Sequence, residues 1–195
     1  MSRKLSKLFY CRGAEVVARE LIGSVLVRRW RGKLLKARIV ETEAYVGPHD
    51  LACHASMGKT KRNAVMFGRA GVAYVYFIYG MYDMLNIVCS VEGDPQAVLI
   101  RAAEPLGWEA DLSGPGKLTR GMKITRGFNG VDMTVSGELF VEAGDRAEIA
   151  RSKRIGVEYA KEWAHEELRF YDAGSRHVSK IRRKHEDTKS RRIMK

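Results

Sequence analysis

Two carboxylates and a phenol alternate in the run Glu41-Thr42-Glu43-Ala44-Tyr45. Because successive side chains of a strand point to opposite faces, a strand here would put Glu41, Glu43 and Tyr45 on one face. A carboxylate in that position could activate a water molecule and face a developing positive charge. An exposed face on an edge strand is the simpler interpretation of this motif alone, since burying an unpaired carboxylate is costly. The alternation does not choose between Glu41 and Glu43.

His54 lies among small residues in the run 51–56, so its ring has room around it. A neutral imidazole offers one donor and one acceptor, which suits recognition of the edge of a heterocyclic base. A hydrogen-bonded structural histidine is the alternative. His49 is close in sequence, but no set of Cys, His and Asp residues has the spacing of metal ligands, so we expect no metal site.

Aromatic side chains are concentrated before and around one expected turn: Tyr74, Tyr76, Phe77, Tyr79 and Tyr82. Aromatic rings on a basic protein suit base stacking, which contributes about 1–3 kcal/mol per base. At the expected hairpin tip, Tyr79 and Met81 flank Gly80 and could wedge between base pairs. Ordinary strand packing is the alternative for Tyr74 and Tyr76.

Two polar residues interrupt apolar strand candidates. Arg101 lies within residues 97–104, and a buried arginine needs a carboxylate or phosphate partner, for which Glu43 or Glu104 is available. A purely structural ion pair is an equally good interpretation. Asn86 likewise needs hydrogen-bond partners.

The elements that must position these residues are strands with few helices. Helical spacing covers 14–21 and, in part, 159–168, and a short helix is expected after the turn 113–116. The strand candidates are 24–30, 34–43, a hairpin over 72–91, 97–104 and 168–171. Residues 49–70 are read as a loop with one short helix. Helices flanking a mostly antiparallel, curved sheet place the chain in the α+β class as a single domain.

Composition narrows the function classes. The longest apolar run of the 195-residue chain is the eight residues 72–79, whereas a membrane-spanning helix needs about 20. Segment 1–11 lacks the apolar core of a signal peptide. Three cysteines without CxxC spacing point to a reducing, intracellular compartment: cytoplasm or nucleoid in a prokaryote, the nucleus in a eukaryote.

The net charge of +12 predicts a polyanionic partner, most often nucleic acid. Half of that charge lies in residues 180–195, with eight Lys or Arg and two Asp or Glu. We therefore divide the chain into a domain over 1–179 and a basic tail over 180–195. The tail is either a phosphate-binding segment or a solvated extension.

Several runs together resemble the alkyladenine DNA glycosylases, also called 3-methyladenine or methylpurine DNA glycosylases. The matching runs are 38–45, 47–48, His54, 74–82 with Asn86, 99–105, 113–118 and 154–157. Each is modest alone, but their order and spacing from about residue 14 to 171 are specific.

The resemblance implies a role for each matching residue. Glu43 would be the carboxylate that activates water, and Arg101 and the backbone carbonyl of Ile155 would help to place that water. Tyr79, assisted by Met81, would protrude on the hairpin into duplex DNA and fill the gap left by a flipped nucleotide.

The base pocket would be lined by Tyr45, His54 and Tyr76, with two rings stacking on the base and His54 bonding to it. Asn86 would clash with the exocyclic amine of guanine and exclude it. The implied substrates are alkylated or deaminated purines in duplex DNA, approached from the minor groove by a monomer. The implied reaction is simple hydrolysis that leaves an abasic site, without a metal or organic cofactor.

Two other readings explain part of the sequence. A non-catalytic binder of damaged nucleic acid would keep the pocket and the wedge but has no use for Glu43. A basic RNA-binding protein, for instance one associated with ribosomes, would explain the charge but not Glu43, His54 and Asn86 in this order. Turnover, and competition between duplex DNA and RNA, separate them from a glycosylase.

Overall fold

The computed structural model describes residues 4–78, 80–145 and 147–179. Tyr79 and the basic tail 180–195 therefore lie outside the described residues. Within the described part of the chain, no helix is both long and apolar enough to cross a membrane.

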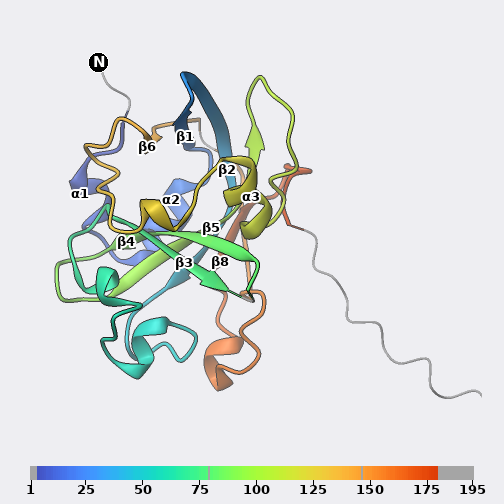
Figure 1. Ribbon diagram of the computed structural model, residues 1–195. Coiled ribbons are helices and arrows are strands. Elements are labelled where there is room, and N and C mark those ends of the chain that lie inside the picture. The colour runs from blue at the N-terminus through green and yellow to red at the C-terminus, as the bar shows by residue number, and fades with distance from the viewer. Residues whose placement is uncertain (1–3, 79, 146, 180–195) are drawn as a thin grey trace, which may run out of the picture.

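One curled antiparallel sheet organises the domain (Figure 1). Its main path runs β3-β4-β5-β2-β1-β6, and β8 joins β2 to β7. The strands are β1 (Val25–Trp30), β2 (Lys33–Tyr45), β3 (Ala73–Ile78), β4 (Tyr82–Cys89), β5 (Gln96–Pro105), β6 (Leu139–Glu142), β7 (Ile149–Ser152) and β8 (Arg169–Asp172). The α+β class and the β3–β4 hairpin are confirmed.

Helices are short and lie against the sheet. They are α1 (Lys7–Tyr10), α2 (Ala14–Leu21) and α3 (Pro115–Gly121), with 3-10 turns η1 (His54–Met57), η2 (Ala64–Phe67), η3 (Arg126–Phe128) and η4 (Lys161–Ala164). Helix α2 has the predicted bounds and buries its apolar face in the main core. The helical spacing over 159–168 was misleading, because only the single turn η4 forms there. The loop 49–70 contains two short turns rather than one.

Strand β2 is an interior strand of the sheet. It pairs with β5 on one side; on the other it pairs with β1 up to Arg38 and with β8 from Glu41 to Glu43. Its register against β5 shifts around Glu41, which marks a bulge. Both Glu41 and Glu43 are fully buried, so the interpretation as an exposed edge strand was wrong.

Two irregular segments, the loop after β2 and the segment after β7, lie beneath the sheet in Figure 1, in cyan and orange. A buried ion pair joins them, with Arg154 Nη2 2.8 Å from Asp50 Oδ1 and both side chains fully buried. Arg154 Nη1 also donates to the carbonyl oxygen of Ala44 at the end of β2. These bonds fix the segment around residue 155 against the end of β2.

Candidate active site

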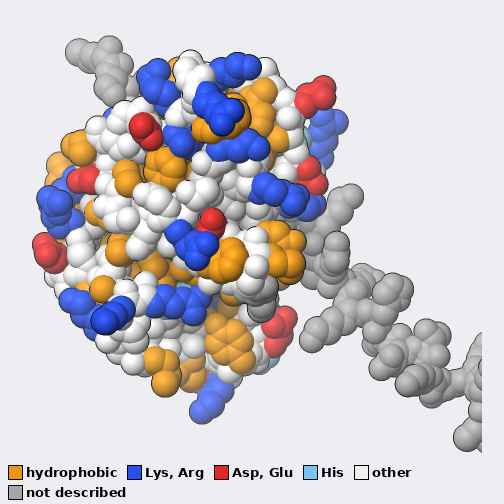
Figure 2. All heavy atoms as spheres, viewed as in Figure 1, with side chains coloured by type: hydrophobic (Ala, Val, Ile, Leu, Met, Phe, Trp, Pro, Cys, Tyr) orange, Lys and Arg blue, Asp and Glu red, His pale blue; other side chains and the backbone are white. Residues whose placement is uncertain are grey.

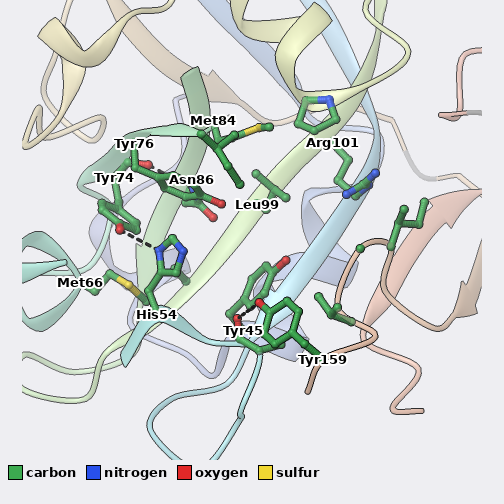
Figure 3. Close-up of a pocket in the computed structure, with 17 residues that line it drawn as sticks. Tyr45, His54, Met66, Tyr74, Tyr76, Met84, Asn86, Leu99, Arg101 and Tyr159 are labelled. Carbon is green, nitrogen blue, oxygen red and sulfur yellow. Dashed lines mark hydrogen bonds between the residues drawn. The ribbon is translucent and has the colours of Figure 1, made fainter. Parts of the chain in front are cut away.

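A cavity of about 290 Å³ lies where β2 to β5 meet these two segments (Figure 3). Six of the residues expected in the site line it: Tyr45, His54, Tyr76, Asn86, Arg101 and Ile155. The fold therefore brings together side chains from segments more than 100 residues apart.

Glu43 lies in the wall behind the cavity lining, where three neighbours hold its carboxylate. The backbone N–H of Ile155 donates to Oε1 across 2.8 Å, and the Tyr45 hydroxyl donates to Oε2 across 3.1 Å. Arg101 Nη1 forms an ion pair with Oε2 at 3.3 Å. Burial, followed by the charge of Glu43, raises the pKa of Tyr45 well above its usual value, so the phenol stays protonated and donates. Each of these three neighbours also lines the cavity.

Arg101 is buried between two carboxylates. Its Nε donates to Glu41 Oε1 across 3.1 Å, while Nη1 reaches Glu43. Burial lowers its pKa, but the charges of Glu43 and Glu41 outweigh burial and raise it overall, so Arg101 remains a cation. Of the two partners proposed from the sequence, Glu43 is confirmed and Glu104 is wrong, because Glu104 pairs with Arg38 at 2.6 Å.

His54 is held by one ring nitrogen. Its Nδ1 lies 2.9 Å from the hydroxyl of the buried Tyr74, and its ring meets that of Tyr76 edge to face, with centroids 4.5 Å apart. Burial, helped by the charge of Arg62, lowers the pKa of His54 to about 4, so the ring is neutral at pH 7. Nε2 makes no hydrogen bond within the described residues, which leaves it available to a ligand.

Strands β3 and β4 supply the opposite wall. Asn86 faces Tyr74 across the two strands, and its Nδ2 donates to the carbonyl oxygen of Tyr74 across 3.3 Å. The buried amide side chain thus has one partner and borders the cavity. In Figure 3 the Tyr74 hydroxyl points at the His54 ring, joined to it by a dashed line, and Tyr76 lies above His54.

Tyr159 was missed by sequence reasoning. Its side chain lines the cavity next to Tyr45 although it is 69 % exposed, and its hydroxyl approaches the carbonyl oxygen of Ala52 at 3.5 Å. The residue begins the segment 159–168, whose partial helical spacing was misleading and so did not show where its side chain points. Met84 and Leu99 add apolar lining that looked like ordinary strand core.

Cations lie near the expected DNA-facing hairpin. The Arg62 guanidinium lies 5.3 Å from the centre of the Tyr76 ring and donates to the carbonyl oxygen of Phe77. Arg126 lies 4.2 Å from the Phe77 ring. Met81, in the turn between β3 and β4, is 66 % exposed and does not line the cavity. On the face that Figure 2 shows, Lys and Arg side chains are spread among hydrophobic ones.

Among the described residues, no three His, Cys, Asp or Glu side chains are grouped so that they could hold a metal ion. The cavity and its wall present a buried carboxylate with an arginine, a neutral imidazole and several phenols.

Comparison with known proteins agrees with the resemblance. Residues 8–176 match the family model described as Methylpurine-DNA glycosylase (MPG). A protein of Methanocella arvoryzae is 50 % identical over 191 residues, covering 90 % of this chain and 96 % of that protein. A protein of Legionella pneumophila (strain Corby) is 48 % identical, covering 91 % and 99 %, and one of Myxococcus xanthus is 47 % identical, covering 90 % and 93 %. All three are named "Putative 3-methyladenine DNA glycosylase". With a match over most of its length and a buried carboxylate beside a cavity, the chain belongs to the methylpurine-DNA glycosylase family of DNA N-glycosylases.

Proposed function

We propose that this protein removes alkylated or deaminated purines, such as 3-methyladenine and 7-methylguanine, from duplex DNA by hydrolysis. Hypoxanthine and ethenoadenine are further candidate substrates, which the test below decides. The product would be an abasic site, the substrate of the next step in base excision repair. The observation that carries the proposal is Glu43, a fully buried carboxylate held by three cavity-lining residues.

A base inside a duplex cannot reach a buried carboxylate, so the nucleotide must leave the stack. Unstacking costs a few kcal/mol and least for a damaged base, which supplies part of the selectivity. In the cavity, Tyr45 and Tyr76 would stack on the base and His54 Nε2 would bond to its edge. Asn86 would oppose the exocyclic amine of guanine.

The reaction breaks the bond between C1′ of the sugar and the ring nitrogen, and the electron pair leaves with the base. Positive charge develops on the sugar as this bond lengthens, and the anionic Glu43 stabilises it. Water then adds its oxygen to C1′ and gives a proton to Glu43. Arg101 and the carbonyl of Ile155 would place that water. A cationic alkylated purine leaves as a neutral base, whereas a neutral lesion needs a proton or a donated hydrogen bond.

No lysine is among the cavity-lining residues of the described chain, so we propose hydrolysis rather than lyase chemistry through a Schiff base. Approach from the minor groove, with Tyr79 and Met81 filling the vacated stack, belongs to the same proposal. The exposure of Met81 at the turn supports it.

Single-turnover release from duplex oligonucleotides tests this function. Each oligonucleotide would carry one lesion: a 3-methyladenine analogue, 7-methylguanine, hypoxanthine or ethenoadenine. Alkali would reveal abasic sites as strand breaks. Release from at least one alkylated purine is expected, and the rates rank the lesions. Tight lesion binding without release from any of them would favour a non-catalytic damage binder.

A further inference from the structure

A second carboxylate, Glu41, is fully buried two residues before Glu43 and does not line the cavity. Four donors bind it. Its Oε1 accepts from Arg101 Nε at 3.1 Å, Arg169 Nε at 2.6 Å and Ser179 Oγ at 2.8 Å. Its Oε2 accepts from the backbone N–H of Ser179 at 2.7 Å. Such complete satisfaction makes Glu41 the centre of an ordered polar cluster.

The charges in this cluster balance. Glu41 and Glu43 contribute two negative charges, and the buried Arg101 and Arg169 contribute two positive ones. Burying charges is costly unless they are paired, so each member depends on the others. Arg169 is itself anchored, since its Nη1 donates to Ser152 Oγ across 2.9 Å.

Arg101 is shared unequally between the two carboxylates. Its hydrogen bond goes to Glu41, whereas its contact with Glu43 is an ion pair through one nitrogen at 3.3 Å. The other polar groups around Glu43 are Tyr45 on its own strand and, from neighbouring segments, the backbone N–H of Ile155 and the side chains of Tyr76 and Arg154. None of these holds the Arg101 guanidinium. Of the three guanidinium nitrogens, Nε is bound to Glu41 and Nη1 faces Glu43.

We propose that Glu41 is a positioning residue for base excision that acts through Arg101. It turns the guanidinium so that only one nitrogen faces Glu43, which leaves Glu43 free enough to accept a proton from water. This inference rests on the proposed function, because it assigns Glu41 a part in the same reaction. With the Glu41 charge removed, Arg101 would keep Glu43 as its carboxylate partner, and its guanidinium would turn toward Glu43 and weaken it as a base.

The first test is Glu41→Gln, which keeps the side-chain shape and removes the charge. We expect the single-turnover rate to fall about 10- to 100-fold, as misplacement of a catalytic group does. The affinity for lesion DNA should stay within about twofold, because Glu41 does not line the cavity. Glu104→Gln is the matched control: it neutralises a carboxylate on β5 that pairs with Arg38 and contacts neither Glu41 nor Glu43. It should keep the wild-type rate.

A double-mutant cycle distinguishes a positioning role of Glu41 from a general destabilisation of the fold around the site. If Glu41 acts through Arg101, the double variant Glu41→Gln/Arg101→Gln should be no slower than Arg101→Gln alone. The double variant also restores charge balance, so its Tm should not lie below that of Arg101→Gln. The proposal would be overturned if the rate losses of the two single variants multiply in the double variant. It would also be overturned if Glu41→Gln loses as much affinity for lesion DNA as it loses in rate.

A milder variant covers the case in which Glu41→Gln does not fold. Ser179→Ala removes one donor to Glu41 and should slow base release about two- to threefold at unchanged lesion affinity. Ser175→Ala, in the same segment, removes a hydroxyl that caps His177 and should leave the rate unchanged. If the parent enzyme is active and Glu41→Gln releases bases at the wild-type rate, the role of Glu41 is refuted while the proposed function stands. Where Glu41→Gln does not fold, a wild-type rate for Ser179→Ala has the same meaning. A parent enzyme that releases no lesion refutes the proposed function as well.

Discussion

The backbone N–H of Ile155 donates a hydrogen bond to Glu43 Oε1 across 2.8 Å, and the two residues are 112 positions apart in the chain. This bond ties the candidate base to the segment that follows β7. The same segment is held against the end of β2 by the buried Arg154–Asp50 pair. The orientation of the carboxylate therefore depends on an ion pair that does not touch it.

Glu43→Gln should abolish base release, with a loss of at least about 10³-fold, and leave lesion binding nearly intact. The amide keeps the shape of the side chain but cannot accept a proton from water or stabilise positive charge on the sugar. Single-turnover release and a binding titration with the same lesion duplex measure the two effects. Release at the parent rate would show that Glu43 is not the base.

Asp50→Asn should destabilise the fold by about 3–5 kcal/mol, because it leaves the fully buried Arg154 guanidinium without its counter-charge. Urea unfolding followed by circular dichroism measures the change. Asp111→Asn is the matched control, since it breaks the exposed pair with Lys117, and it should cost less than about 1 kcal/mol. Equal costs for the two variants would mean that the Arg154–Asp50 pair does not anchor the segment.

His54 should make folding sensitive to mild acid. Its pKa is about 4 in the folded protein and 6.5 when unperturbed, so the unfolded chain binds the proton more readily between these values. Stability from this group is complete above pH 6.5 and is lost as pH falls toward 4, by roughly 2 kcal/mol at pH 5.

The measurement compares unfolding free energies at pH 7 and pH 5 for the parent and for His54→Gln. The parent should lose roughly 2 kcal/mol more than the variant over this interval. His165→Gln, on an exposed side chain, serves as the control and should behave like the parent. The same pH dependence in the parent and in His54→Gln would show that His54 does not titrate in this way.

Asn86→Ala should relax discrimination against guanine. The substitution removes the amide that borders the cavity and, with it, the proposed clash with the exocyclic amine. We expect slow release of undamaged guanine that the parent does not show, together with faster release of 7-methylguanine, because both bases carry the same exocyclic amine. The measurement is liquid chromatography of the bases released from unmodified duplex DNA. If no guanine is detected, Asn86 does not determine the discrimination against guanine.

Sequence alone determined the features that depend on neighbours in the chain. Helix α2 follows from apolar spacing that closes a turn every few residues, and the β3–β4 hairpin follows from two β-prone runs joined by a turn. The order and spacing of the motifs also indicated the family and the candidate residues, because both can be read from the sequence without knowing the fold.

Only the tertiary structure decided what surrounds those residues. The burial of Glu41 and Glu43 depends on β8 taking over the edge of β2 where β1 leaves it, and the partners of Arg101 depend on a bulge in the β2–β5 register. Tyr159 lines the cavity from the segment after β7, which the buried Arg154–Asp50 pair holds against the end of β2. Burial and ion pairing come from contacts between segments distant in sequence, and local spacing carries no information about which of those segments meet.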